Sequence, residues 1–293
     1  LRAGHRGPPS LERGGRGSLM ATVSMIDEVD AADDSPVAQP RRTVPVAVIV
    51  TPIIFFSIFI GAWQLLVRAA DIQVLLLPAP TDIIDRFFTD FGLLFELAQN
   101  TAIEAFKGVL IGSFLGVTLA GITQPFRWLN RGLLSYSSTV KALPVVALFP
   151  LTTIFFGVSS TAVVAMVTIA VSPIMFTYAS RGFSGTSEHD ELMRSISAGP
   201  LTRFWSLVLP RALPYVMTGL KTIVPLSIII AIISQYFGGS VTTLGSYIRR
   251  ESTSLHTVDM WSAIVMACTL GITAFVAVSL LDKFLLRWHP SNR

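Results

Sequence analysis

Long stretches without a charged side chain constrain this sequence more than any other feature. They cover residues 43–67, 108–126, 142–180, 222–248 and 260–281. A helix needs about 20 apolar residues to cross a bilayer, and 52% of the 293 residues are hydrophobic while only 14% are charged. A soluble domain of this length could not bury so much apolar surface in one core. Because the alternation of a β-barrel is absent, the sequence predicts an all-α polytopic membrane protein.

The charge-free stretch 142–180 is too long for a single span. Its 39 residues would form a helix of about 60 Å at about 1.5 Å per residue. We expect the chain to turn at Gly157–Ser160, because Gly and Ser interrupt helices. Six transmembrane helices follow, at residues 44–68, 101–123, 133–156, 160–180, 212–237 and 259–281.

The distribution of Lys and Arg predicts the orientation of these spans. With the N-terminus in the cytoplasm, 15 of the 22 basic residues fall in cytoplasmic segments. The outer segments then keep only Arg68, Arg86, Arg249 and Arg250. Six spans place both termini in the cytoplasm. The first apolar run begins after residue 40 and is too long for the apolar region of a signal peptide.

The composition divides the chain into three parts. Residues 1–42 are polar, lack apolar periodicity and are predicted to form a disordered cytoplasmic arm. Residues 43–288 form the transmembrane domain, and residues 289–293 a short tail. Cys268 is the single cysteine and the four histidines are scattered, so we expect no disulfide and no metal site.

The outer segment at residues 71–99 contains a pattern of apolar residues with a helical period. They follow Asp82, a candidate helix cap, and are Ile83, Ile84, Phe87, Phe88 and Phe91. The pattern predicts an amphipathic helix, which lies in the outer membrane interface or packs over the mouth of the bundle.

The loop at residues 181–211 is the longest cytoplasmic connection between spans. Ser187 can cap a short helix that stops at Gly199–Pro200, and Thr202 can cap a second helix that runs to Pro210. The apolar residues of this hairpin are Leu192, Met193, Ile196, Phe204 and Trp205. Either the hairpin folds back under the bundle, or it docks a cytoplasmic partner, as compact apolar patches do.

The same loop resembles the signature of the inner-membrane permease subunits of binding-protein-dependent ABC importers. That signature is Glu-Ala-Ala, three residues, Gly, nine residues and Ile-x-Leu-Pro. Here Glu191, Leu192 and Met193 open the pattern, Ser197 occupies the Gly position, and Leu207–Pro210 closes it. Both alanines and the glycine are replaced, and Gly199 can supply the tight turn instead.

Other segments resemble one branch of this family, which serves sulfonate, taurine, nitrate and pyrimidine-precursor importers. They are Leu77–Pro80, Lys141–Pro144, Ala147–Leu151, Leu244–Tyr247 and Arg287–Trp288. The resemblance implies a type I importer permease in a bacterial inner membrane. It also implies a second permease subunit, identical or homologous, a cytoplasmic ATPase dimer and an extracytoplasmic solute-binding protein. The implied ATPase-coupling residues are Glu191, Leu192, Met193, Ile196, Ser197, Gly199, Leu209 and Pro210.

The motifs of nucleotide and hydrolytic chemistry are missing from the sequence. It contains no Gly-x-x-x-x-Gly-Lys-Ser/Thr phosphate loop, no Gly-x-Ser-x-Gly and no His-Glu-x-x-His. We therefore expect a chain that is not an enzyme and holds no cofactor, with ATP bound by the partner subunit.

Polar residues inside the predicted spans are functional candidates, because they are costly in a bilayer. Lys141 and Lys221 are expected to extend toward the inner headgroups. Glu104 is expected to pair with Lys107, three residues away. Ser234, Gln235 and Tyr236 lie late in the fifth span, where the family often carries Glu. Gln235 either lines the translocation pathway or bonds between helices.

Two other classes of protein compete with a permease subunit. A stand-alone secondary transporter or channel should show internal repeats or interrupted helices around a midplane site, and no internal repeat is evident. An intramembrane enzyme should show paired acidic or histidine side chains within the spans, whereas the acidic residues here lie mostly at span ends.

Overall fold

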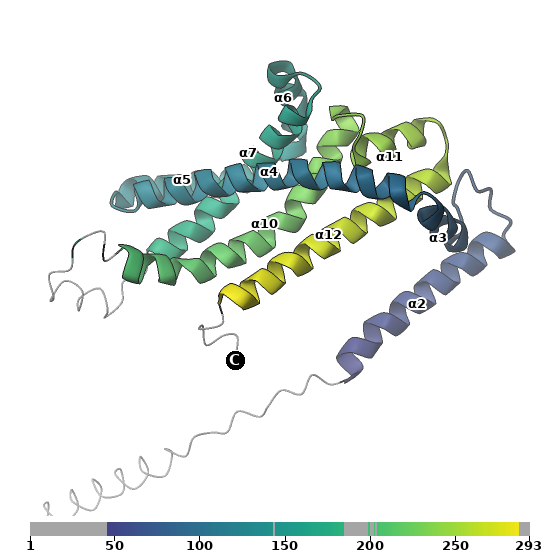
Figure 1. The fold of residues 1–293 in the computed structure, drawn as a ribbon, viewed down its shortest axis with the longest axis horizontal. Coiled ribbons are helices and arrows are strands. Elements are labelled where there is room, and N and C mark those ends of the chain that lie inside the picture. The colour runs from purple at the N-terminus through teal and green to yellow at the C-terminus, as the bar shows by residue number, and fades with distance from the viewer. Residues whose placement is uncertain (1–45, 143, 185–198, 200–201, 203, 287–293) are drawn as a thin grey trace, which may run out of the picture. The chain divides into compact units, whose positions relative to one another are not determined.

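The computed structural model describes residues 46–142, 144–184, 199, 202 and 204–286. All regular elements within these ranges are helices (Figure 1). The chain divides into two units, residues 1–56 and 57–293. The described part of the first unit is the beginning of helix α2 (Val46–Ala69), and the second unit contains the rest of α2 and every other described helix.

Five helices of the described chain are long and apolar enough to cross a membrane. They are α2, α4 (Phe91–Thr123), α7 (Ser160–Phe183), α10 (Leu209–Gly238) and α12 (Thr257–Leu285). Helices α4, α7, α10 and α12 each contain one of the predicted spans, and α2 covers the described part, residues 46–68, of the first. The prediction of an all-α multi-pass membrane protein is therefore confirmed.

The continuous helix predicted at 133–156 is wrong. This segment is divided among α5 (Arg127–Ala142), a 3₁₀ turn η1 (Val145–Leu148) and α6 (Phe149–Phe156). Pro144 and Pro150 account for the breaks, because proline lacks an amide hydrogen and fits only the first turn of a helix. The turn predicted at Gly157–Ser160 is confirmed, since Gly157 ends α6 with a φ of 71° and α7 begins at Ser160.

Two shorter helices lie at the end of the bundle where α4 begins. The predicted amphipathic helix is α3 (Pro80–Thr89), which ends before Phe91. Asp82 is not its cap, as Ala79 holds that position and the Asp82 carboxylate accepts a hydrogen bond from Arg68 at 2.9 Å. The other helix, α11 (Leu244–Thr253), was not predicted, because its ten residues are too few and too polar to resemble a span.

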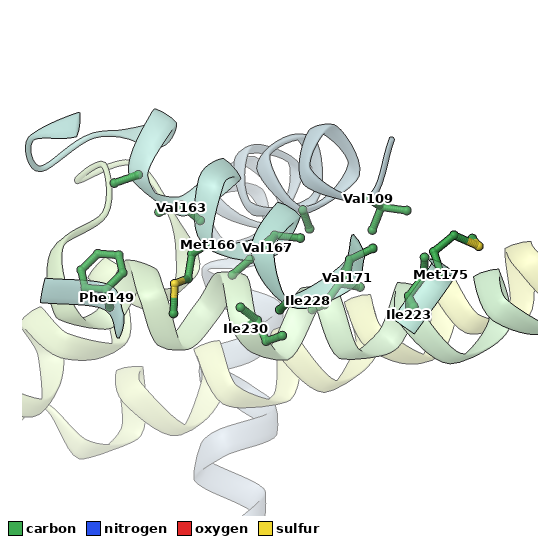
Figure 2. Packing of buried hydrophobic residues seen from close by; sticks show 14 residues of the cluster. Val109, Phe149, Val163, Met166, Val167, Val171, Met175, Ile223, Ile228 and Ile230 are labelled. Carbon is green, nitrogen blue, oxygen red and sulfur yellow. The ribbon is translucent and has the colours of Figure 1, made fainter. Parts of the chain in front are cut away.

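The main core forms where α4, α7 and α10 pack side by side (Figure 2). Its buried side chains come mostly from α7 and α10, with Phe149 of α6 closing one end. The labelled members in Figure 2 are Val109, Phe149, Val163, Met166, Val167, Val171, Met175, Ile223, Ile228 and Ile230. Helix α7 is the central element, because half of its apolar 18-residue stretch is buried. This share is larger than in any other candidate span of the described chain.

Glycines every four residues let α4 approach α7 closely. A Cβ at Gly108 would lie 2.5 Å from Val167, and one at Gly116 would lie 2.7 Å from the carbonyl oxygen of Ser172. Gly112 is only slightly less crowded. Small residues at this spacing are a common means of helix association in membranes, where lipid competes equally for apolar side chains.

The contact predicts different results for the same substitution at two glycines of α4. Gly116→Ala should lower the free energy of unfolding by about 1–3 kcal/mol, the usual cost of overpacking. Gly92→Ala is the control, because nothing lies within 4 Å of a Cβ at that position. The thermal midpoint of the purified chain in detergent measures the difference. Equal midpoints for both variants would contradict the assigned packing.

Candidate functional site

A buried carboxylate lies where α4, α7 and α10 meet. Glu104, on α4, is only 5% exposed. One carboxylate oxygen accepts a hydrogen bond from the hydroxyl of Ser160, the first residue of α7. The other accepts one from Nε2 of Gln235 on α10 at 2.8 Å. The predicted pair with exposed Lys107 is therefore wrong, and Glu104 instead joins three helices.

Gln235 extends this polar cluster to α11. Its Oε1 accepts hydrogen bonds from the Thr101 hydroxyl at 3.0 Å and from the Gly245 amide at 3.2 Å. The Thr101 hydroxyl also accepts a bond from the Leu244 amide at 3.0 Å. We call Thr101, Glu104, Ser160, Gln235 and the first two amides of α11 the polar node. Bonding between helices, one of the two roles open to Gln235, is confirmed, while its place in the pathway stays a prediction.

The other two predicted pathway residues lie beside the node without joining it. Ser234 is fully buried, and its hydroxyl has no hydrogen-bond partner in the described chain. Tyr236 is half-buried, and its ring meets that of Phe237 edge-on at 5.6 Å between centroids.

Gly245 allows α11 to come this close to α10. A Cβ there would lie 2.2 Å from the carbonyl oxygen of Ile232 and 2.6 Å from Cβ of Gln235. Backbone cannot yield by such distances, so a side chain at this position would break the bond between the Gly245 amide and Gln235.

The two lysines of the predicted spans have partners within the protein. Lys221 of α10 forms an ion pair with Asp282 near the end of α12. Lys141, near the end of α5, donates a hydrogen bond to the Thr177 hydroxyl of α7 at 2.7 Å. The expectation that both simply extend to headgroups missed these contacts, which join segments far apart in the sequence.

Charged residues of α3 and α12 meet Asp90, which lies between α3 and α4, at the end of the bundle where α11 lies. Arg86 of α3 pairs with Asp90 at 2.9 Å and with Asp259 of α12. The hydrogen bond to Asp259 raises the pKa of Arg86, with burial opposing it. Burial first, then the carboxylates of Asp259 and Glu251, raise the pKa of Tyr247 to about 12.

Glu251 of α11, in the same group of side chains, also has a shifted pKa. Burial acts to raise its pKa, but hydrogen bonds from His256 and Arg250 outweigh burial and hold the pKa below its usual range. Ligand atoms of Glu251, His256 and Asp259 lie within 4.8 Å of one another, the spacing of a metal site. Arg86 and Arg250 already pair with two of these carboxylates, so ion pairs account for the arrangement of the cluster.

At the other end of the bundle, the residues that begin and end the loop at 181–211 are held together. The carbonyl oxygen of Phe183, the last residue of α7, accepts hydrogen bonds from Gln124 at 2.8 Å and from Arg211 at 3.1 Å. A Cβ at Gly182 would lie 2.9 Å from Cα of Ala212. The end of α7 and the start of α10 are therefore in backbone contact.

Most of the predicted coupling residues, Glu191, Leu192, Met193, Ile196 and Ser197, lie outside the described residues. Gly199 is described and exposed, without regular structure. The second helix of the hairpin was predicted to end at Pro210, which is wrong. A π-helical turn η2 (Phe204–Val208) continues directly into α10 at Leu209, and Pro210 fits because it lies in the first turn of α10.

These features define an all-helical membrane protein whose closely packed spans carry a buried polar node at one end and a fixed loop attachment at the other. The family described as the inner membrane component of binding-protein-dependent transport systems matches residues 108–287. The chain belongs to this family and is a multi-pass permease of the inner membrane.

Named relatives cover most of the chain. It is 28% identical over 244 residues to the formylaminopyrimidine transport permease protein ThiX of Halalkalibacterium halodurans, covering 82% of this chain and 96% of the relative. It is 26% identical over 239 residues to the putative aliphatic sulfonates transport permease protein SsuC of Escherichia coli, covering 79% and 89%. It is also 26% identical over 213 residues to the nitrate import permease protein NrtB of Leptolyngbya laminosa, covering 69% and 73%.

A solved structure shares the fold. A chain of the inward-facing MetNI methionine ABC transporter is 17% identical, with a TM-score of 0.51, and covers 65% of this chain and 93% of that one. The predicted fold class, a type I importer permease, is confirmed.

Gln235→Leu should destabilise the protein by at least about 2 kcal/mol. The substitution removes one hydrogen bond each from the Glu104 carboxylate, the Thr101 hydroxyl and the Gly245 amide, and a buried group left unpaired costs about 1–3 kcal/mol. Ser234→Ala is the adjacent control, since it removes a buried hydroxyl that has no partner. Thermal midpoints in detergent measure both. A Gln235→Leu midpoint equal to that of Ser234→Ala would show that the node does not support the fold.

Glu251 makes the stability depend on pH in the acidic range. Its pKa in the folded protein lies below the ordinary value of 4.5, so its ionised form contributes stability above pH 4.5 that is lost as the pH falls further. Between about pH 5 and pH 3, Glu251→Gln should flatten the fall in thermal midpoint. Glu96→Gln, at an exposed position of α4, should not. Parallel curves for wild type and Glu251→Gln would refute this assignment.

Proposed function

We propose that this chain forms the solute pathway of an ATP-driven importer and couples it to separate ATPase subunits. The observation that carries the proposal is the match to the permease family over 108–287 together with the correctly spaced loop at 191–210. The complete transporter would contain a second permease subunit, a cytoplasmic ATPase dimer and an extracytoplasmic solute-binding protein. ATP would bind to the ATPase, and this chain would need no cofactor.

In this proposal the loop is cytoplasmic, and so are both termini. The hairpin at 187–210 docks in a groove of the ATPase through Leu192, Met193 and Ile196, with Glu191 supplying a charged contact. The contacts of Phe183 with Gln124 and Arg211 support a mechanical role, because they join the loop's attachment points to α4 and α10. Closure of the ATPase pair would then move α7 and α10 as a rigid body between inward and outward access.

The solute is proposed to be a small anion, such as a sulfonate, taurine or nitrate, or a pyrimidine or thiamine precursor. The names of the three relatives support this range, because they specify a formylaminopyrimidine, aliphatic sulfonates and nitrate. Ser234, Gln235 and Tyr236 are the proposed pathway residues. Their position at the end of α10, directly before α11, supports a gate that opens when the polar node separates.

Weakening the loop should uncouple the ATPase while leaving the permease in the membrane. Met193→Ala combined with Ile196→Ala removes two apolar anchors, and truncating one buried anchor typically costs about 1–4 kcal/mol. Glu191→Lys reverses a charge and should do more harm at low salt. The measurement is the amount of ATPase recovered with the affinity-purified permease, alongside solute-stimulated ATP hydrolysis.

Met25→Ala with Ile26→Ala is the matched control, because it removes the same two side chains from the N-terminal arm. The control should retain full ATPase recovery. Normal recovery and normal hydrolysis in both loop variants would reject the coupling role. Solute uptake by the permease alone, without ATPase, would favour a stand-alone secondary transporter or channel instead.

A further inference from the structure

A basic pocket lies between α4, α5 and α7, at the end of the bundle where the loop is attached. Its volume is about 550 Å³, within the range of small-molecule sites. Three arginines line it, Arg127 and Arg131 from the first turns of α5 and Arg181 from the end of α7. None of the three pairs with a carboxylate within the described residues, and no acidic side chain is among the described residues that line the pocket.

Two buried polar side chains that line the same pocket have unused hydrogen-bonding capacity. Ser180 is 1% exposed and Asn130 is 9% exposed. Neither Oγ of Ser180 nor Oδ1 of Asn130 has a partner in the described chain. Because buried polar groups are nearly always hydrogen-bonded, this pair points to a ligand that offers a hydroxyl as well as negative charge.

The surroundings of the pocket match the level of lipid headgroups. Trp128 and Phe126, on either side of Arg127, are exposed, Trp128 to 76%. Exposed aromatic side chains next to arginine are typical of the membrane–water interface. The start of α5 also contributes the positive end of its helix dipole to the pocket, and Leu134 supplies an apolar wall on which a lipid glycerol can rest.

We propose that this pocket binds the headgroup of an anionic glycerophospholipid of the inner leaflet. The three guanidinium groups hold the phosphate, and Ser180 and Asn130 bond to headgroup hydroxyls, as a phosphatidylglycerol would offer. Basic pockets between transmembrane helices on the cytoplasmic side are known sites for such lipids. The assignment to the inner leaflet rests on the orientation given under the proposed function. The assignment of the pocket to an anionic headgroup does not.

The position of the pocket gives the lipid a structural consequence. Two residues that line it are Arg181, in the last turn of α7, and Ser184, which directly follows that helix. A bound headgroup would therefore link the end of α7 to the start of α5, beside the Phe183 carbonyl that Gln124 and Arg211 hold.

Native mass spectrometry of the purified full chain tests the proposal, with dioleoyl phosphatidylglycerol and dioleoyl phosphatidylcholine titrated separately. Wild type should retain phosphatidylglycerol in preference to phosphatidylcholine. Arg131→Gln should weaken that preference about fivefold, the fold-change that corresponds to about 1 kcal/mol for each basic side chain at an anionic surface. Arg127→Gln combined with Arg131→Gln should weaken it about 25-fold, the product of two fivefold effects.

Three further variants keep the result interpretable. Arg131→Lys preserves the charge and should retain most of the preference. Ser184→Glu adds a negative charge at an exposed position of the pocket and should lower the preference without disturbing the fold. Arg249→Gln removes one charge from α11, at the opposite end of the bundle, and should change nothing.

Three outcomes would overturn the proposal. Equal retention of phosphatidylglycerol by the double variant and by Arg249→Gln would show that the pocket does not bind the lipid. If inorganic phosphate displaced the lipid and bound the pocket as strongly as the lipid does, the pocket would be assigned to free phosphate. Loss of ATPase recovery in the double variant, with lipid binding unchanged, would make the pocket an ATPase contact. Lipid binding is measured without ATPase or solute, so failure of the proposed transport function leaves this test intact.

Discussion

Close backbone contact of α7 with α4 and α10 is the constraint on which the rest of this structure depends. Lipid tails are as apolar as the helices, so burial of apolar surface cannot by itself hold spans together. The glycines at 108, 112 and 116 bring α4 against α7, and Gly182 brings the end of α7 against Ala212 of α10. These contacts place Glu104 beside Ser160 and Gln235, and they place Gln124 and Arg211 beside the Phe183 carbonyl.

The two ends of the packed helices carry different polar structures, and each satisfies groups that would be costly to bury unpaired. At one end the polar node attaches α11 to α4 and α10 through Gln235 and Thr101. At the other end, side chains from α4 and α10 bind the last carbonyl of α7. In the proposed mechanism, a motion that enters at the loop would reach α7 and α10 together, and the bonds of the polar node would have to accommodate it.

Much of the fold could be predicted from charge and hydropathy, because a span is a local property of about 20 residues. The segment 133–156 was mispredicted because Pro144 and Pro150 weigh little in a count of apolar residues, although they decide where helices break. Glu104 was assigned to Lys107 because sequence shows neighbours on one helix, whereas its partners Ser160 and Gln235 come from distant helices. The glycine spacing of α4 is a sequence signal for close helix packing, but a count of apolar residues does not register it. The spacing of the loop signature is visible in the sequence, whereas the coupling role of its residues stays a prediction.

The central claim is that the end of α7 and the start of α10 move as one body when the loop is driven. Spin labels at Ser184 and Tyr215, both exposed, in a Cys268→Ser background, measure this by pulsed electron resonance on the assembled transporter. The comparison is between the nucleotide-free state and a state arrested with ATP and vanadate, with loss of ATP hydrolysis confirming the arrest. The account predicts one unchanged distance in both states. A shift approaching one helical turn, about 5 Å, would contradict it.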